Sequence, residues 1–167
     1  SGVRFAAAGF TNLTPDHLDF HGTMDAYGAA KERLFTELAP ASAALSVDDP
    51  FVRALAARTA PAGRWRVSAS GAHDAELRVA HRDVGPSGTV ATFATRGGDV
   101  TIRSALLGAH NLENLGVALG LLAGVGVPLT DAAHALSGDL SVPGRLERCD
   151  AAGDDVTVLV DFAHTPD

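Results

Sequence analysis

Short apolar runs alternate with helical repeats along the first part of the chain. Residues 3–10 (VRFAAAGF) and 41–47 (ASAALSV) are apolar and are followed by polar turn residues, which is the pattern of buried strands. A helix ending near residue 39 separates the two runs, and a shorter helix, residues 51–59, follows the cap Asp48-Asp49-Pro50. This order of strand, helix, strand and helix predicts a parallel sheet.

The longer of these helices is predicted to be amphipathic. Thr23 or Asp25 can cap its first turn. Apolar residues then recur at helical spacing, at Met24, Tyr27, Ala30, Leu34 and Leu38. Lys31 follows Ala30 directly, so we expect it near the edge of this apolar stripe.

The pattern changes after Pro61. Four runs with the pattern of strands follow one another with only Gly, Pro and Asp turns between them, at residues 64–70, 75–83, 88–95 and 99–106. Three or four adjacent strands without helices predict a small antiparallel subsheet. Two helices follow, near residues 111–125 and 130–138, and then an apolar strand over 156–162 that we expect to be buried. The predicted fold class is α/β: a mostly parallel sheet with flanking helices plus this subsheet.

Composition narrows the class of protein. Hydrophobic residues make up 46% of the 167 residues and charged residues 20%, which is typical of a globular domain. A net charge of −7 without any basic run argues against nucleic acid as a partner. No apolar stretch is long enough to span a membrane. The single cysteine, Cys149, cannot form an internal disulfide, so we expect a cytoplasmic protein.

Two features in the first part of the chain could carry chemistry. If residues 17–21 are extended, His17, Asp19 and His21 point to one side and could bind a divalent metal. The alternative is a solvated loop whose aspartates cap a helix. Lys31 is the only lysine among 13 lysine and arginine residues. Its amine, unlike a guanidinium, can be deprotonated and react as a nucleophile, although most helical lysines are solvated cations.

Two further features indicate nucleotide binding. Asn111 and Asn114 open a predicted helix, where free N–H groups attract anions and amides can hold a base or a ribose; alternatively, Asn111 only caps the helix. Arg145 follows a Pro-Gly turn, and the donors of its guanidinium fit a phosphate. Asp161 lies at the end of the last predicted strand, shortly before His164, and ligands of open α/β sheets gather at such strand ends. The alternatives are a surface arginine and a capping aspartate.

The chain resembles the Mur ligase family in the order and spacing of these motifs. The resemblance lies in TNLTPDHLDFHGTMDAYGAAKERLF, GAHNLENLGVALGLLAGVGVPL, VPGRLERC and VLVDFAHTPD, covers residues 5–39 and 106–167, and is closest to the tripeptide synthetase branch. It implies the later part of a P-loop-type central domain at residues 1–157, and a hinge into a truncated C-terminal ligase domain at 158–167. The chain starts and stops on predicted strands, so we expect a piece of a longer protein.

The resemblance also implies roles for single residues. His17 would ligate a magnesium ion, and Lys31 would be carbamylated by carbon dioxide, which replaces a cation that repels Mg²⁺ with the oxygen ligands that the ion prefers. Asn111 and Asn114 would contact the nucleotide, Arg145 its phosphates, and Asp161 its ribose side near the hinge.

The implied reaction uses ATP and Mg²⁺. The terminal carboxylate of UDP-N-acetylmuramoyl-L-Ala-D-Glu becomes an acyl phosphate, and the amine of a diamino acid, diaminopimelate or lysine, displaces the phosphate. The chain departs from the family pattern at two points. His110 replaces the phenylalanine usual in this branch. The chain also contains no Gly-x-x-Gly-Lys-Thr/Ser loop to hold phosphates, so we expect no ATP hydrolysis from these residues alone. The rival hypotheses are a metal-dependent hydrolase that uses His17, Asp19 and His21, and a non-catalytic nucleotide-binding relic.

Overall fold

A six-stranded sheet forms the centre of the protein in the computed structural model, which describes residues 2–59, 63–72, 74–150, 153 and 155–163. The first four strands are joined by parallel pairing, and the last two pairings are antiparallel. The strands follow in chain order across the sheet: β1 (Ala7–Phe10), β2 (Ser42–Ser46), β3 (Gly63–Ser68), β4 (Leu77–Gly85), β5 (Gly88–Ala94) and β6 (Val100–Ser104). The predicted α/β class, with a mostly parallel sheet and an antiparallel part, is therefore confirmed, and the antiparallel part contains three strands.

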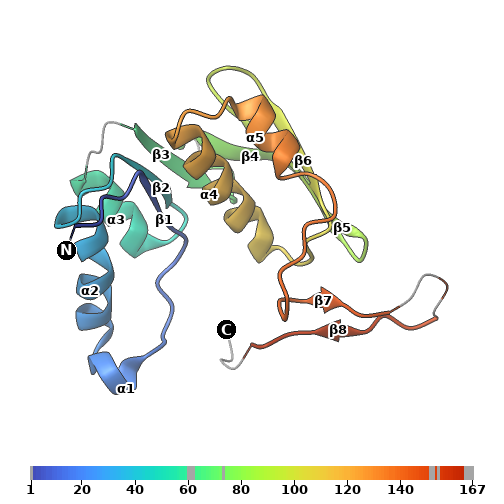
Figure 1. Cartoon of the computed structure of the whole chain (residues 1–167), viewed down its shortest axis with the longest axis horizontal. Helices are drawn as coiled ribbons and strands as arrows, with labels where there is room; N and C mark the ends of the chain where they lie inside the picture. Colours follow the sequence, from blue (N-terminus) through green and yellow to red (C-terminus); the bar gives the residue numbers. More distant parts are fainter. Residues whose placement is uncertain (1, 60–62, 73, 151–152, 154, 164–167) are drawn as a thin grey trace.

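Helices cover both faces of the sheet (Figure 1). They are α2 (Met24–Thr36), α3 (Pro50–Arg58), α4 (His110–Gly124) and α5 (Leu129–Ala135), whereas the short helix α1 (Leu18–His21) lies away from the sheet, at the start of α2. Alternation along β2 divides them between the two faces. Ala43 and Leu45 belong to the buried cluster that includes residues of α2 and α3, whereas Ala44 belongs to the cluster that includes α4 and α5.

Local capping explains where the helices of the first half begin. The Thr23 hydroxyl accepts a hydrogen bond from the Ala26 N–H (3.2 Å), so Thr23 rather than Asp25 is the cap of α2. The Asp49 carboxylate accepts from the Val52 N–H (2.9 Å), and Pro50 occupies the first helical position of α3, as its fixed φ allows.

The buried stripe of α2 differs from the prediction. Ala30 and Leu38 are exposed, and Phe35 is buried instead, stacked on Phe10 of β1 with ring centroids 6.0 Å apart. The prediction was wrong at these positions because the large aromatic ring gains more from burial than an alanine methyl group does.

Three glycines let α4 approach the sheet closely. Gly116, Gly120 and Gly124 are four residues apart and therefore lie on one face of the helix. A Cβ atom at Gly116 would lie 2.5 Å from Val67 of β3, and one at Gly120 would lie 3.0 Å from the Cβ of Ala44. The small face of α4 thus sets how near the helix lies to β2 and β3.

The end of the chain forms a separate hairpin, in which β7 (Glu147–Arg148) pairs antiparallel with β8 (Leu159–Val160). The predicted burial of residues 156–162 is wrong, since Val156 is 62% exposed and Phe162 68%. The regular strand is also shorter than predicted, as is β1, which begins at Ala7 rather than at residue 3. Among the described residues, β8 pairs with β7 and with no strand of the main sheet, and both of its residues, Leu159 and Val160, are exposed. Among the described residues, no helix has the length and apolar character that crossing a membrane requires.

Candidate functional site

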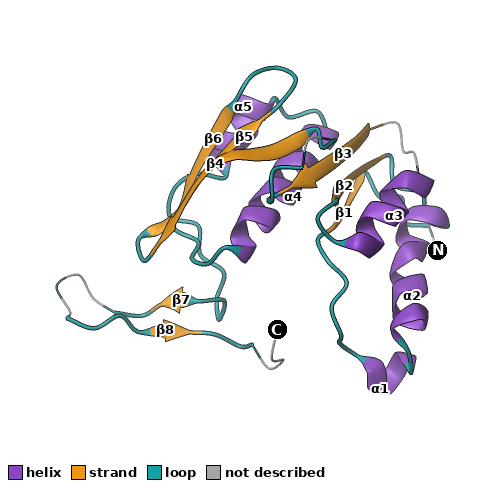
Figure 2. Ribbon diagram, turned by 180° about the vertical axis from the view of Figure 1, so that it is seen from behind, coloured by secondary structure: helices purple, strands orange, loops and turns teal. Residues whose placement is uncertain are grey.

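Polar residues follow the carboxyl ends of the parallel strands. Asn12 and Thr14 come after β1, Asp48 after β2, and Ser70 after β3. Because the three strands are adjacent and parallel, these ends lie at one edge of the sheet, where ligands of open α/β sheets bind. Figure 2 shows the loop after β1 leaving the sheet at this edge, beside the first turn of α4.

A cavity of about 640 Å³ lies at this edge, and its size is typical of a small-molecule site. We call it the strand-end cavity. It brings together all four residues that the sequence predicts for nucleotide binding, from α4 and from both sides of the β7–β8 hairpin. The residues that line it are Asn12, Thr14, Leu106, His110, Asn111, Asn114, Val142, Arg145, Leu146, Asp161 and Ala163.

Hydrogen bonds hold the two asparagines of α4 in place. Asn111 is buried, and its Nδ2 donates to the Leu107 carbonyl (2.6 Å) and lies 3.2 Å from the His110 ring nitrogen. The Asn114 Nδ2 donates to the Asn111 Oδ1 (3.1 Å). Asn111 is not the cap of α4, because Ala109 occupies that position. The exposed Asn114 therefore offers the cavity a side chain whose orientation Asn111 fixes.

A tight turn brings Arg145 next to Asp161. The Arg145 N–H donates to the Val142 carbonyl (3.0 Å), and Gly144 in this turn has a φ of +67°, which favours glycine. The Phe162 ring lies against Gly144, where a Cβ atom would come within 2.4 Å of it. A side chain at position 144 would push the turn away from residues 161–163.

The Asp161 carboxylate is held as an anion. It accepts hydrogen bonds from the N–H groups of Ala163 (2.5 Å) and Leu146 (2.8 Å). These donors, and then the electrostatic effect of Arg145 and of His110, hold the pKa of the Asp161 carboxyl below its ordinary value. The cavity thus presents a carboxylate next to a guanidinium. His164 lies outside the described residues.

Sequence reasoning missed Glu113, in the first turn of α4. Its carboxylate accepts hydrogen bonds from the hydroxyl of Ser46, at the end of β2, and from the Nδ2 of Asn12 (3.1 Å), after β1. The available signal was the polar residues near the carboxyl ends of two strands predicted to be buried, Asn12 and Ser46, because a buried polar side chain such as that of Ser46 needs a hydrogen-bonding partner.

Asp48 organises the loop after β3. Its carboxylate accepts hydrogen bonds from the Ser68 hydroxyl (2.7 Å) and from the N–H groups of Ala69 (2.7 Å) and Ser70 (2.9 Å). Burial raises the pKa of the Asp48 carboxyl, but the hydrogen bonds from the side chains of Ser70 and Ser68 and from these N–H groups outweigh it, so the pKa lies below its ordinary value.

His17 and Lys31 lie outside the strand-end cavity, against a common ring. The Lys31 Nζ is 5.2 Å from the centroid of the Tyr27 ring, and the His17 ring centroid is 6.1 Å from it. His17 Nε2 also lies 3.3 Å from the Asp16 carboxylate. The two predicted metal ligands are therefore neighbours of the same buried tyrosine.

The extended arrangement of His17, Asp19 and His21 is not found. Residues 18–21 form the short helix α1, with His17 in the left-handed conformation before it, because this turn satisfies its own backbone hydrogen bonds. In the part of the chain that the structure describes, no group of three His, Cys, Asp or Glu side chains could hold a metal ion. This geometry does not support the hydrolase alternative.

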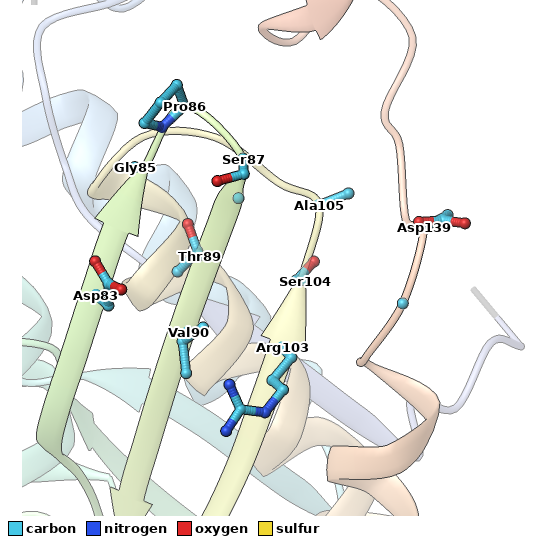
Figure 3. A pocket seen from close by; sticks show the side chains of 12 residues that line it. Asp83, Gly85, Pro86, Ser87, Thr89, Val90, Arg103, Ser104, Ala105 and Asp139 are labelled. Carbon is cyan, nitrogen blue, oxygen red and sulfur yellow. The ribbon is translucent and has the colours of Figure 1, made fainter. Parts of the chain in front are cut away.

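A second cavity, of about 450 Å³, lies between the β4–β5 turn and the end of β6. Figure 3 shows its charged residues, Asp83, Arg103 and Asp139, on three separate segments and not converging on one point. None of the residues predicted to bind a nucleotide or a metal lines it.

Residues 1–122 match the family model of the Mur ligase middle domain. The chain belongs to the Mur ligase family. The match ends within α4, so it includes β1 to β6, Lys31 and both asparagines of the strand-end cavity.

One relative of this Mur ligase chain is the UDP-N-acetylmuramoyl-L-alanyl-D-glutamate--2,6-diaminopimelate ligase of Parasynechococcus marenigrum (strain WH8102). It is 43% identical over an alignment that covers 100% of this chain and 35% of the relative. A solved structure of an enzyme with the same name matches with a TM-score of 0.79 and 30% identity, over 96% of this chain and 33% of that one. The resemblance predicted from the motifs is confirmed, including its branch.

The fold extends to more distant Mur ligases. A MurF ligase from Thermotoga maritima, solved in complex with ADP, matches with a TM-score of 0.68 at 19% identity, over 89% of this chain and 34% of that one. This Mur ligase chain therefore spans about a third of the length of the relatives it matches. The domain boundary at 157/158 stays a prediction; β7 and β8 pair across it.

Proposed function

We propose that the chain is part of an ATP-dependent ligase that adds diaminopimelate to UDP-N-acetylmuramoyl-L-Ala-D-Glu through an acyl phosphate. The observation that carries the proposal is the strand-end cavity, which gathers Asn111, Asn114, Arg145 and Asp161 at the carboxyl ends of parallel strands. Relatives that align over the whole chain are named as diaminopimelate ligases, which favours diaminopimelate over lysine. The proposal includes a cytoplasmic location, which the single, exposed cysteine supports.

Each cavity residue suits one part of ATP. Asn114 can donate to or accept from a base or ribose, and Asn111 keeps its amide in position. Arg145 offers a planar set of donors that fits phosphate oxygens. The Asp161 carboxylate, which is held ionised, can accept hydrogen bonds from ribose hydroxyl groups.

His17 and Lys31 fit a magnesium ion once the lysine is modified. An ammonium repels the ion, whereas a carbamate on Lys31 and the imidazole of His17 would offer oxygen and nitrogen donors next to Tyr27. Lys31 is exposed, so carbon dioxide can reach its amine. A magnesium ion held there would stabilise negative charge on phosphoryl oxygens.

The ligase reaction tests the proposal. The complete protein that contains this chain is incubated with ATP, Mg²⁺, UDP-N-acetylmuramoyl-L-Ala-D-Glu and diaminopimelate, and ADP release is followed. We expect ADP release that requires both the acceptor and the amine. ADP release in the absence of the acceptor or of the amine would contradict a ligase and favour a hydrolase. Nucleotide binding without any ADP release would favour the non-catalytic relic.

A further inference from the structure

Glu113 connects the ends of two strands to the first turn of α4. Its Oε1 accepts from the hydroxyl of Ser46, which is fully buried at the end of β2, and its Oε2 accepts from Asn12 Nδ2 at 3.1 Å. The partners lie 67 and 101 positions away in the sequence. Glu113 itself is half-buried and does not line the strand-end cavity, whereas Asn12 does.

This contact decides which atom Asn12 offers to a ligand. An ionised carboxylate only accepts hydrogen bonds, so it can pair with the amide nitrogen of asparagine and not with the amide oxygen. The Asn12 Oδ1 is then the atom left to accept. Among the described residues, none donates a hydrogen bond to it.

We propose that Glu113 is a positioning residue for the nucleotide: it orients Asn12 so that Oδ1 accepts from an N–H or O–H donor of the ligand. The inference rests on the proposed nucleotide site. The donor is either the exocyclic amine of the base or a ribose hydroxyl. Ser46 fixes the carboxylate from the other side, so Asn12 cannot turn its amide without breaking the contact.

The substitution Glu113→Gln tests this orientation at nearly constant shape. A glutamine that keeps its amide oxygen on the Ser46 hydroxyl turns its amide nitrogen toward Asn12, where it can pair only with Oδ1, so the Asn12 amide is reversed and Oδ1 is lost to the ligand. In the complete ligase we expect KM for ATP to rise about tenfold, as the loss of one hydrogen bond would give, with kcat within about twofold. Asn12→Ala should give the same rise, and the double variant should equal Asn12→Ala alone because Glu113 acts through Asn12.

Nucleotide analogues separate the two donors. Inosine triphosphate lacks the amine, and 2′-deoxy-ATP lacks one ribose hydroxyl. With the analogue that lacks the donor to Asn12, wild type and Glu113→Gln should have the same KM. Glu37→Gln, on an exposed residue at the end of α2, is the control for a glutamate-to-glutamine change.

Two results would overturn the inference. One is an unchanged KM for ATP in Glu113→Gln. If that variant only unfolds more easily, the contact has a merely structural role. The other is a double variant whose KM for ATP rises by the rise in Glu113→Gln multiplied by the rise in Asn12→Ala, since the two residues would then act independently. A wild-type protein without ATP-dependent ligation would instead overturn the proposed function, and the inference with it.

Discussion

The Nζ of Lys31 lies 5.2 Å from the centroid of the Tyr27 ring, one helical turn earlier on α2. Tyr27 is buried, and His17, on the segment before α1, contacts the same ring. A lysine amine and an imidazole from two separate segments thus share one rigid neighbour. This shared neighbour supports the proposal that both residues bind one metal ion.

Substitution of Lys31, the only lysine among these 167 residues, tests the proposed carbamate. We expect Lys31→Ala and Lys31→Arg each to lower ligase activity of the complete protein about 100-fold, since neither side chain can form a carbamate. Added formate or acetate should partly restore Lys31→Ala. Arg33→Ala, on the same helix, is the control; an active Lys31→Arg variant would rule out a carbamate.

Asn111 and Asn114 should differ in their effects on stability. Asn111→Ala removes a buried side chain that bonds to Leu107, and should lower the free energy of unfolding by about 1–3 kcal/mol. Asn114 is exposed, so Asn114→Ala should change it by less than about 0.5 kcal/mol while still weakening ATP binding. Unfolding can be followed by the fluorescence of the half-buried Trp65. Equal losses in both variants would contradict the assigned roles.

Asp48 should make stability depend on pH. Its pKa is lower in the folded state than in the unfolded chain, so its stabilising effect is present above the unfolded value of about 4 and is lost as the pH falls through the folded value. Asp48→Asn should therefore destabilise the protein by about 1–2 kcal/mol at pH 7, and the difference from wild type should shrink in acid. Denaturant titrations at pH 7 and pH 3 measure this. Asp131→Asn, at an exposed position of α5, is the control for an aspartate-to-asparagine change.

Gly116 tests the close contact of α4 with the sheet. Alanine gains up to about 1 kcal/mol of helix propensity, but its Cβ would lie 2.5 Å from Val67 and 2.9 Å from Phe93. Overpacking costs about 1–3 kcal/mol, so we expect a net loss of about 1 kcal/mol in Gly116→Ala. Gly97→Ala, whose Cβ would meet nothing nearer than 3.8 Å, is the control. A stabilised Gly116→Ala would show that the helix can move away from the sheet.

Local rules predicted the elements that local interactions determine. Thr23 and Asp49 cap their helices as expected. The predictions failed where burial depends on distant partners. Residues 156–162 have the apolar pattern of a buried strand, yet within the described part of the chain β8 pairs only with the two-residue strand β7 and stays exposed.

Glu113 shows the same limit within the site. Nothing next to it in the sequence indicates a role, because its partners Ser46 and Asn12 come near only when the sheet forms. Asn111 and Arg145, in contrast, could be proposed from a helix start and a Pro-Gly turn, which short segments reveal, and the structure places both at the same cavity.

The most direct measurement of the central claim is the affinity of the complete protein for ATP, with and without Arg145→Ala, by isothermal titration calorimetry. If the strand-end cavity holds the phosphates, the wild-type protein should bind ATP and the variant should bind it about 10–100-fold more weakly, as the loss of a charged hydrogen-bonding group would give. Equal affinities would contradict this account and place the nucleotide elsewhere.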